Sequence, residues 1–376
     1  MDEIRVAVLG MGFIGKAHTY AYTALPFFYE NLPYRVKLKA VYNRTLATAQ
    51  AAKDSFGFEF ATDDMDEVFR RDDIDVVSVC LPNFQHAEAV IKAAQRGWHI
   101  YCEKPLAASE ADAVRMLEAL EGKDIRHQIV FHYRCFACVM RARQIIDEGR
   151  LGRVLSFNVT YQHPSNVDSA KPYTWKYSKE HACGGTLFDM GSHALDMLYY
   201  LMGGYREIYA KTQIAHKTRR DNAGRECVVD VEDAAYIIAE MESGAQGTIH
   251  VSKIAAGTND DFRVEIFGEK GAIRFDLMDP NWVWFCDNTV PDGSLGGYSG
   301  FTKIESVQRY EAPGGSFPSP KLPGGWLRAH VHSLYRFMDC VHTGRPCSPD
   351  IKDGAYIQHV LEAAYASDRT GTSITI

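Results

Sequence analysis

The segment from Gly184 to Asp196, with the sequence GGTLFDMGSHALD, places an acid and a base where they could move a proton together. Asp189, His193 and Asp196 stand at positions i, i+4 and i+7, and the apolar run at residues 197–202 predicts that they share one face of a helix. Histidine titrates near neutral pH and suits proton transfer beside a carboxylate. Spacing alone leaves three alternatives open: a histidine satisfied in the core, a helix cap at Asp189, or a metal site.

A cation stands in a second pattern, Glu103-Lys104-Pro105, directly after a predicted strand at residues 99–102. Ligands of open parallel sheets bind beyond the carboxyl ends of the strands, so we expect Lys104 to face the cofactor side. A lysine ammonium there suits a developing alkoxide. The position alone is equally compatible with a surface lysine.

A glycine motif lies between a predicted strand at residues 4–9 and a predicted helix at residues 16–24. It consists of Gly10, Met11, Gly12, Phe13, Ile14 and Gly15. In such a loop the first glycine permits a tight turn, the second lets a dinucleotide pyrophosphate approach the backbone, and the third lets the helix pack closely on the strand. The strand and helix on either side favour a dinucleotide site over a purely structural glycine turn.

The end of the next predicted strand, residues 36–42, bears on which dinucleotide binds. NAD-selective domains usually place Asp or Glu there, whereas an arginine accommodates the 2′-phosphate of NADP. This chain has Asn43-Arg44-Thr45 and no acid at that point. Arg44 can pair with phosphate, stack on adenine or be an exposed residue at a helix start. We expect NAD(P), with NADP slightly favoured over NAD.

The elements that must position these residues fall into two patterns. Up to residue 131 strands alternate with helices, which predicts an α/β domain with a doubly wound parallel sheet of the Rossmann type at residues 1–131. The remaining predicted strands are residues 75–80 and 128–131, and the remaining predicted helices are residues 45–55, 65–70, 86–96 and 109–120. The aromatic, proline-containing residues 26–33 are expected to form a loop.

Residues 132–376 predict a substrate-binding and oligomerisation α+β domain. A helix at residues 136–148 leads into long alternating runs, which are typical of a large, mostly antiparallel open sheet with one free face. The expected strands are residues 154–161, 207–214, 234–241, 247–253, 262–267 and 272–276. Residues 287–325, rich in Gly, Ser and Pro, should form a long surface excursion. Helices at residues 329–343 and 352–368 are expected to close the chain.

Charge and composition exclude several classes of protein. The net charge of −7 argues against nucleic-acid binding, and the basic residues 217–220 lie among acids, as in a solvated loop. An acidic start and the lack of a long apolar run predict a cytoplasmic protein without membrane contact. Nine scattered cysteines fit a reducing compartment. Cys135 and Cys138 have CxxC spacing but no second CxxC accompanies them, so we interpret them as free thiols and expect no metal.

Together these motifs resemble the glucose-fructose oxidoreductase, inositol dehydrogenase and rhizopine-catabolism family (Gfo/Idh/MocA), in the family's order and over both domains. The resemblance implies that Lys104, Asp189 and His193 are catalytic and that the subunits associate through the C-terminal sheet into a homo-oligomer. Besides the glycine motif, the implied cofactor contacts are Asn43, Arg44, Leu81, Pro82, Asn83, His86, Glu103, Lys104, Pro105, Trp175 and Lys176. Members often carry Trp-Arg at the last pair, and lysine does not reproduce the bidentate geometry of arginine.

More narrowly, Asn43-Arg44-Thr45, the excursion before the second strand and residues 264–273 resemble the sugar-oxidising branch that includes levoglucosan dehydrogenase. One departure lies after Tyr133-Arg134-Cys135, where Phe136-Ala137-Cys138 replaces the proline that often follows the family's Tyr-Arg-Phe. The wall near the substrate is therefore expected to differ.

The family's chemistry predicts transfer of a hydride between a ring hydroxyl of a sugar, glycoside or cyclitol and the nicotinamide. His193 would serve as general base or acid, Lys104 would polarise the reacting oxygen, and Asp189 would be a second substrate contact. Polar residues expected near a polyol substrate, or else at an exposed strand end, are His132, Tyr161, Gln162, His163 and Asn166. Two alternatives are a redox-neutral glycosidase or epimerase that retains its NAD(P), and a non-catalytic dinucleotide sensor.

Overall fold

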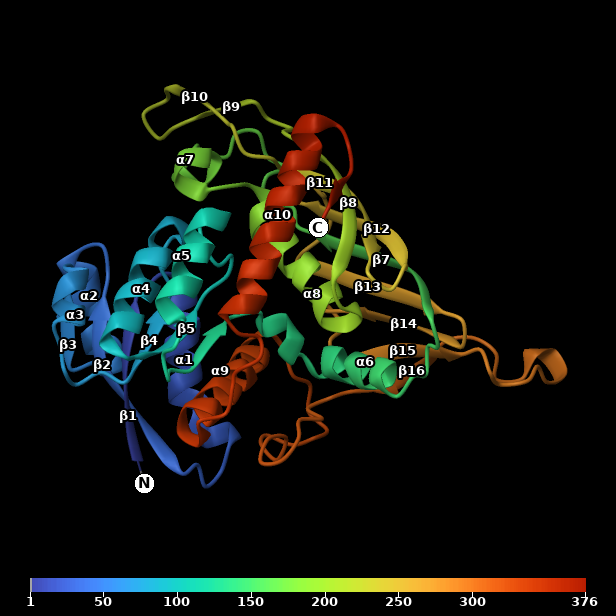
Figure 1. Cartoon of the computed structure of the whole chain (residues 1–376), viewed down its shortest axis with the longest axis horizontal. Coiled ribbons are helices and arrows are strands. Elements are labelled where there is room, and N and C mark those ends of the chain that lie inside the picture. The colour runs from blue at the N-terminus through green and yellow to red at the C-terminus, as the bar shows by residue number, and fades with distance from the viewer. Residues whose placement is uncertain (1) are drawn as a thin grey trace. The chain divides into compact units, whose positions relative to one another are not determined.

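The computed structural model describes residues 2–376, which form two compact units (Figure 1). The first unit contains the residues up to Cys135 together with Tyr310–Pro320 and Gly325–Gln358. The second contains Phe136–Arg309, Lys321–Gly324 and His359–Ile376. We expected a single division between residues 131 and 132. The structure instead returns two late segments to the first unit.

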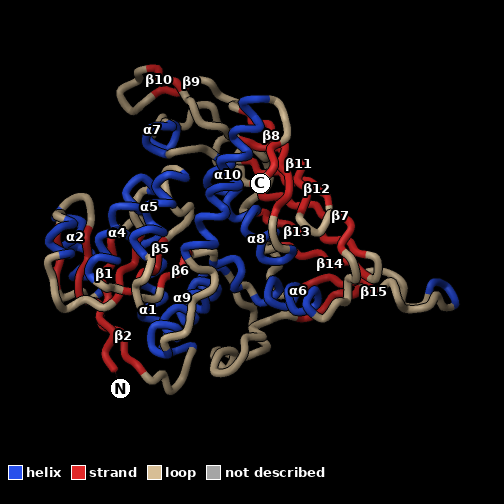
Figure 2. Tube along the Cα trace, viewed as in Figure 1, coloured by secondary structure: helices blue, strands red, loops and turns tan. Residues whose placement is uncertain are grey.

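A six-stranded parallel sheet forms the centre of the first unit, in the order β3-β2-β1-β4-β5-β6. Figure 2 shows strands of this sheet in red among the helices in blue. Its strands are β1 Asp2–Leu9, β2 Tyr34–Tyr42, β3 Phe60–Thr62, β4 Val76–Val79, β5 His99–Cys102 and β6 His127–Ile129. The chain order reverses between β1 and β4, so the loops after these strands meet at the topological switch point, where doubly wound sheets bind ligands. The predicted Rossmann-type sheet is confirmed, and only β3 among its strands lacks a predicted counterpart.

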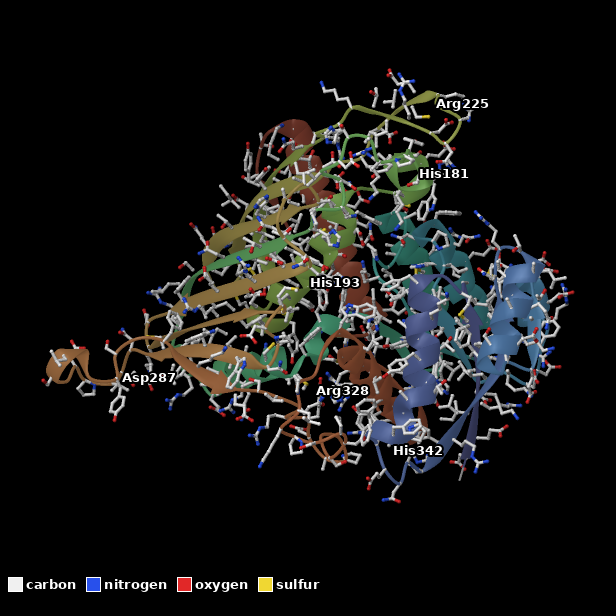
Figure 3. The ribbon with its side chains drawn as sticks, turned by 180° about the vertical axis from the view of Figure 1, so that it is seen from behind. His181, His193, Arg225, Asp287, Arg328 and His342 are labelled. Atoms are coloured by element: carbon white, nitrogen blue, oxygen red, sulfur yellow. The ribbon has the colours of Figure 1, made fainter. Side chains whose placement is uncertain are left out.

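Helices cover both faces of this sheet. α4 and α5 lie in front of it in Figure 1, and α1 comes to the front in the reversed view of Figure 3. The helices are α1 Phe13–Phe28, α2 Leu46–Phe56, α3 Met65–Phe69, α4 His86–Arg96, α5 Glu110–Leu120 and α9 Trp326–Thr343, with 3-10 turns at Asn83–Gln85 and His132–Cys135. Thr45 and Ser109 cap α2 and α5 with side-chain oxygens that accept backbone N–H groups. No helix within residues 2–376 is long and apolar enough to cross a membrane.

α1 extends further than the sequence predicts. We expected a loop at residues 26–33, but the helix continues through Pro26 to Phe28. Tyr29, directly after the helix, is buried and stacks on Tyr335 of α9 with 3.8 Å between the ring centroids. Aromatic packing therefore outweighs the helix hydrogen bond that the proline removes.

α9 belongs to the core of the first unit although it comes late in the sequence. Phe337 of α9 lies in the same buried apolar cluster as Val8 of β1. Arg328, labelled in Figure 3, donates from Nη1 to the Tyr29 hydroxyl at 2.9 Å, and its guanidinium lies 3.8 Å from the ring centroid of Tyr310. The late segments therefore complete the core of this unit.

A nine-stranded sheet forms the centre of the second unit, in the order β16-β15-β14-β13-β7-β12-β11-β8-β17. Its neighbouring strands are antiparallel except β7 and β12, which confirms the expected mostly antiparallel sheet. The strands are β7 Val154–Gln162, β8 Tyr205–Gln213, β11 Ala234–Met241, β12 Gln246–Ser252, β13 Asp261–Gly268, β14 Gly271–Asp276, β15 Trp282–Asp287, β16 Thr302–Glu305 and β17 Ile374–Thr375. A hairpin of β9 Thr218–Arg220 and β10 Glu226–Val228 stands apart from this sheet.

The helices of this unit are short. They are α6 Ala137–Asp147, α7 Lys179–Ala182 and α8 Ser192–Met202, with 3-10 turns at Trp175–Tyr177 and Ser294–Gly296 and a π-helical turn at Leu187–Gly191. α10, Ile351–Thr370, contributes residues 351–358 to the first unit and the rest to the second. The π-helical turn carries Asp189, one of the predicted catalytic residues, and leads directly into α8.

The two faces of the nine-stranded sheet differ. α6 and α8 pack on one face (Figure 1), and the strands bury alternate apolar residues there, among them Val159, Ile249 and Val264. The opposite face carries exposed Tyr236 and Ile238. An antiparallel sheet can leave one face uncovered, so this arrangement confirms the expected open sheet.

Two surface predictions need correction. Residues 287–325 are not a simple surface excursion, because they include β16 and the fully buried Ser306. The basic residues 217–220 are exposed as expected except for Arg219, but residues 218–220 form strand β9 and not a loop. Arg219 is buried, and its guanidinium lies 4.7 Å from the ring centroid of Tyr177. Its hydrogen bonds go to the backbone carbonyls of Asn166, Asp168 and Lys171. A local charge pattern does not reveal carbonyl partners that the folded chain supplies.

Candidate cofactor and catalytic site

Steric limits fix the glycine loop after β1. Gly10 has a φ of +94°, and a Cβ there would lie 2.5 Å from the carbonyl oxygen of Cys80. A Cβ on Gly15 would lie 2.0 Å from the carbonyl oxygen of Gly10. Gly12, the N-cap of α1, differs because a Cβ there would meet no atom within 4 Å. The open space lies where this motif brings a pyrophosphate to the amides at a helix start, so the loop fits a dinucleotide.

The end of β2 approaches the glycine loop through Asn43, whose Oδ1 lies 3.5 Å from the amide nitrogen of Met11. Arg44 is exposed beside it. The exposed carboxylate of Asp63, which follows β3, accepts the N–H of Leu46 at 3.1 Å. An acid therefore lies close to the end of β2 although the local sequence contains none. The sequence pattern does not reveal it because β3 is too short to be predicted.

His86, an expected cofactor contact, lies buried between two loops, and its contact with a cofactor stays a prediction. Its Nε2 lies 2.8 Å from the carbonyl oxygen of Leu81, and its Nδ1 lies 3.1 Å from that of Pro105. The residue is fully buried, and burial lowers its pKa. Both ring nitrogens face backbone carbonyls, so the ring lies between the loop after β4 and the segment after β5, and in its neutral form it donates to one of the two. The cofactor contacts expected from Leu81, Pro82 and Asn83 in the first of these loops stay predictions.

The side chain of Glu103 is also turned inward, and its expected contact with a cofactor stays a prediction. One carboxylate oxygen lies 2.9 Å from Nε2 of His18, and the other accepts the backbone N–H of Lys104 at 3.1 Å. Lys104 itself is partly exposed beyond the carboxyl end of β5, as expected. The glutamate therefore acts on the backbone of the lysine.

Two residues of α9, Trp326 and His330, belong to none of the sequence motifs. They contact the glycine loop and the turn after β6. The rings of Trp326 and Phe13 lie 5.3 Å apart, and His330 stacks on His132 at 3.8 Å between centroids. The rings of Trp326 and His330 are 4.2 Å apart. Burial lowers the pKa of His330 well below its ordinary value, and His132 and His18 add to the lowering, so His330 stays neutral near pH 7. His132, the predicted substrate contact, is thus part of a buried aromatic wall.

His18, Glu103 and His330 form a group whose potential metal-ligating atoms lie within 4.8 Å of one another. The 2.9 Å between His18 Nε2 and Glu103 Oε1 is a hydrogen-bond distance. Two ligands of a tetrahedral zinc ion would lie about 3.3 Å apart, given metal–ligand bonds of roughly 2.0–2.1 Å. The geometry therefore favours a hydrogen bond over a metal centre, and the expected lack of a metal stays a prediction.

The predicted acid/base residues lie where the π-helical turn runs into α8. His193, labelled in Figure 3, is buried on the first turn of α8. Its ring centroid lies 6.3 Å from that of Tyr161 on β7. Asp189 is exposed, and its Oδ2 accepts from Nζ of Lys253 at 2.8 Å. Asp196 is buried. The π-helical turn therefore interrupts the single helical face that we expected for these three residues. Asp189 pairs instead with Lys253, which follows β12 and is not part of the sequence motif.

A buried carboxylate holds the segment that precedes Asp189. Oε1 of Glu232 accepts the N–H groups of Gly185 and Leu187 at 3.0 and 2.8 Å and the hydroxyl of Tyr365 at 2.9 Å. Burial raises the pKa of Glu232, and these hydrogen bonds oppose the rise. A Cβ on Gly185 would lie 2.2 Å from the Glu232 carbonyl oxygen, so the glycine is required for this close approach.

The other polar residues predicted to face a substrate divide into two groups. Tyr161 is buried and donates to Asp260 at 2.8 Å, and His163 is partly exposed after the end of β7. Asn166 is buried and donates to Asp233 at 2.8 Å, so we assign it a structural role. Burial of Tyr161 and Asn166 also rules out the alternative of a wholly exposed strand end.

Trp175 and Lys176 lie on the 3-10 turn after β7, and both are exposed. Nζ of Lys176 lies 5.9 Å from the centroid of the Trp175 ring, within reach of a cation–π contact. Their exposure leaves them open to a ligand.

Cys135 and Cys138 are both buried, free thiols. Burial raises the pKa of each, that of Cys138 to about 12. The thiolate is the form that attacks disulfides or binds metals, so a thiol that stays protonated is poorly suited to either role. This environment supports the interpretation of the CxxC spacing as structural.

Two family models match the chain. Residues 4–131 match the oxidoreductase family with an NAD-binding Rossmann fold, and residues 139–274 match the GFO/IDH/MocA C-terminal domain. The chain belongs to the GFO/IDH/MocA family. It is therefore an enzyme of the oxidoreductase class with an NAD-binding domain, as the motifs predict.

Relatives within the family include sugar and cyclitol dehydrogenases. Levoglucosan dehydrogenase of Pseudarthrobacter phenanthrenivorans is 31% identical over 98% of this chain and 96% of that protein. Myo-inositol 2-dehydrogenase of Thermotoga maritima is 29% identical over 77% of this chain and 80% of that protein. A solved structure of levoglucosan dehydrogenase in complex with NADH and levoglucosan matches with a TM-score of 0.95 at 30% identity, covering 100% of this chain and 99% of that one. The similarity agrees with the branch that the motifs indicate.

The glycine loop yields a paired prediction. Gly12→Ala should fold normally, because the added Cβ meets no protein atom, yet it should raise the Kd for NADH by about tenfold or more, because the pyrophosphate needs that space. Gly15→Ala should lower the melting temperature, because its Cβ would press on the carbonyl of Gly10. NADH fluorescence titration and thermal melting separate the two effects. Unchanged NADH affinity in Gly12→Ala would place the pyrophosphate elsewhere.

Proposed function

We propose that this protein is an NAD(P)-dependent dehydrogenase that moves a hydride between a ring CH–OH group of a sugar, glycoside or cyclitol and the nicotinamide. The observation that carries the proposal is the presence of Lys104, Asp189 and His193 together at the family's motif positions, in a chain 31% identical to a levoglucosan dehydrogenase over 98% of its length. The inositol dehydrogenases among the relatives support a wider class of cyclic polyols.

Each site residue has surroundings that support a role. His193, buried on α8, takes the hydroxyl proton on its imidazole during oxidation and returns it during reduction. Lys104 supplies an ammonium that stabilises the developing alkoxide. Asp189, exposed and paired with Lys253, is a second contact for substrate hydroxyls. A bound nicotinamide supplies the hydride acceptor.

The first experiment follows absorbance at 340 nm while the wild-type protein meets levoglucosan, myo-inositol and glucose with NAD or NADP. We expect net formation of reduced cofactor with at least one of these sugars. Conversion of a sugar without an absorbance change would contradict the dehydrogenase and support a redox-neutral glycosidase or epimerase. Tight NADH binding without conversion of any sugar would support a sensor.

In the same assay, Lys104→Ala and His193→Ala should each lower kcat by about 10²-fold or more, because each removes a group that acts on charge or a proton in the transition state. The Kd for NADH should stay within about twofold, since the dinucleotide is held mainly by the glycine loop. Lys123→Ala and His181→Ala are matched controls at exposed positions and should keep wild-type turnover. Near-normal turnover in either site variant would exclude the assigned role.

The choice between dinucleotides depends on Arg44. Its exposed guanidinium can pair with the 2′-phosphate of NADP, which supports a slight preference for NADP, although the solved relative holds NADH. Arg44→Ala should raise the KM for NADP by about tenfold and change that for NAD by no more than about twofold. Steady-state kinetics with both cofactors tests this. An equal rise for both would instead indicate stacking of Arg44 on adenine.

We also propose that the open face of the nine-stranded sheet binds a second copy of the chain. Ile238 is 58% exposed and lies opposite Tyr209, which is 38% exposed, so the apolar surface continues across two strands. Ile238→Lys should shift the mass measured by light scattering toward the monomer, because it would bury an unpaired charge. Leu46→Lys changes a similarly exposed apolar residue of the first unit and should have no effect. A monomeric wild type, or an unaltered mass in Ile238→Lys, would contradict the proposal.

A further inference from the structure

A buried histidine of α1 holds the carboxylate that precedes Lys104. His18 is 1% exposed and Glu103 is 5% exposed. Nε2 of the histidine and Oε1 of the glutamate lie 2.9 Å apart. The other oxygen, Oε2, accepts the backbone N–H of Lys104 at 3.1 Å. The carboxylate thus joins α1 to the backbone of Lys104, whose ammonium we propose acts on the substrate.

The hydrogen bonds assign the tautomer of His18. A carboxylate only accepts, so Nε2 carries a proton. Nδ1 lies 3.2 Å from Oγ of Ser78 and 3.2 Å from Sγ of Cys80, and the Tyr22 hydroxyl lies 3.1 Å from Oγ of Ser78. Ser78 can donate to Nδ1 while it accepts from Tyr22. One directed chain of hydrogen bonds then runs from Tyr22 through Ser78 and His18 to Glu103.

Because His18 and Glu103 are buried, the loss of the hydrogen bond between them is costly. A buried carboxylate that loses a donor keeps its desolvation penalty and is driven to find another partner. One oxygen of Glu103 is held by His18, and the other accepts the N–H of Lys104. If the bond to His18 is lost, the carboxylate can rotate, and its bond to the Lys104 N–H no longer has a fixed direction. The rate is sensitive to such a release, because a displacement of about 1 Å in a reacting group can cost about 10²-fold.

We propose that His18 is a positioning residue that acts through Glu103 to hold the backbone of Lys104 where its ammonium meets the reacting oxygen. The proposal rests on the proposed function of Lys104. α1 then has two tasks, because its first turn receives the dinucleotide and a residue about one and a half turns later holds the lysine.

The test compares His18→Leu, which removes the donor, with His18→Gln, whose amide can still donate to Glu103. His18→Leu should lower kcat by about tenfold or more, while the sugar KM and the Kd for NADH stay within about twofold. His18→Gln should recover most of the lost kcat. Tyr22→Phe is the matched control, because it removes a hydroxyl from the same buried chain without touching Glu103, and it should keep kcat within about twofold.

Three outcomes would overturn the proposal: a kcat in His18→Leu equal to that in Tyr22→Phe, no recovery in His18→Gln, or a larger change in KM than in kcat. If His18→Leu does not fold, the double variant His18→Leu/Glu103→Leu replaces both partners with apolar groups and should restore stability. It should still show the kcat loss, and full turnover in it would contradict the proposal.

A second readout does not depend on turnover. Hydrogen exchange of the Lys104 amide should be faster in His18→Leu than in the wild type and near the wild-type rate in His18→Gln, because only the leucine variant frees Glu103. Equal exchange in all three proteins would show that His18 does not hold the lysine backbone. Lack of wild-type turnover would instead count against the proposed function, so the two failures are distinguishable.

Discussion

The close approach of two loop backbones at the switch point constrains the whole first unit. The carbonyl oxygens of Cys80 and Gly10 occupy the space that side chains at Gly10 and Gly15 would need. α1 can therefore begin directly at the carboxyl end of β1, and its first turns lie against β4 and the loop after it. That placement brings His18 within hydrogen-bonding distance of Ser78 on β4 and of Glu103 after β5. Side chains at Gly10 and Gly15 would therefore disturb both the glycine loop and the hydrogen bonds that His18 makes from α1.

In both units a buried carboxylate accepts backbone N–H groups next to a predicted catalytic residue. In the first, buried Glu103 accepts the backbone N–H of Lys104. In the second, buried Glu232 accepts N–H groups of the segment leading to Asp189. A buried carboxylate is costly unless it is fully hydrogen bonded, so it fixes the backbone that satisfies it more strictly than apolar packing would. The side chain of Lys104 stays partly exposed and that of Asp189 exposed, while the backbone of Lys104 and the segment before Asp189 are held by buried acceptors.

Much of the fold follows from patterns within single segments. The alternation of strands and helices up to residue 131, the glycine loop and the later alternating runs each depend on neighbours in sequence, and the structure bears out the parallel and open sheets that they predict. The failures arise where distant residues decide. Pro26 stays helical because Tyr29 stacks on Tyr335, and Arg219 is buried because a distant loop supplies three carbonyls. The inward direction of Glu103 is equally invisible, since its partner lies 85 residues away.

The late position of α9 has a consequence for synthesis on the ribosome. Residues of α9 fill the same apolar cluster as β1 and α1, so the strands of the first unit are translated long before the helix that covers them. About 200 residues separate β6 from the end of α9, which corresponds to roughly 10–40 s of elongation at 5–20 residues per second. During that interval the apolar residues of β1 and α1 that pack against α9 in the finished fold lack this partner. The dinucleotide-binding unit thus begins the chain, but its core is complete only after α9 has been translated.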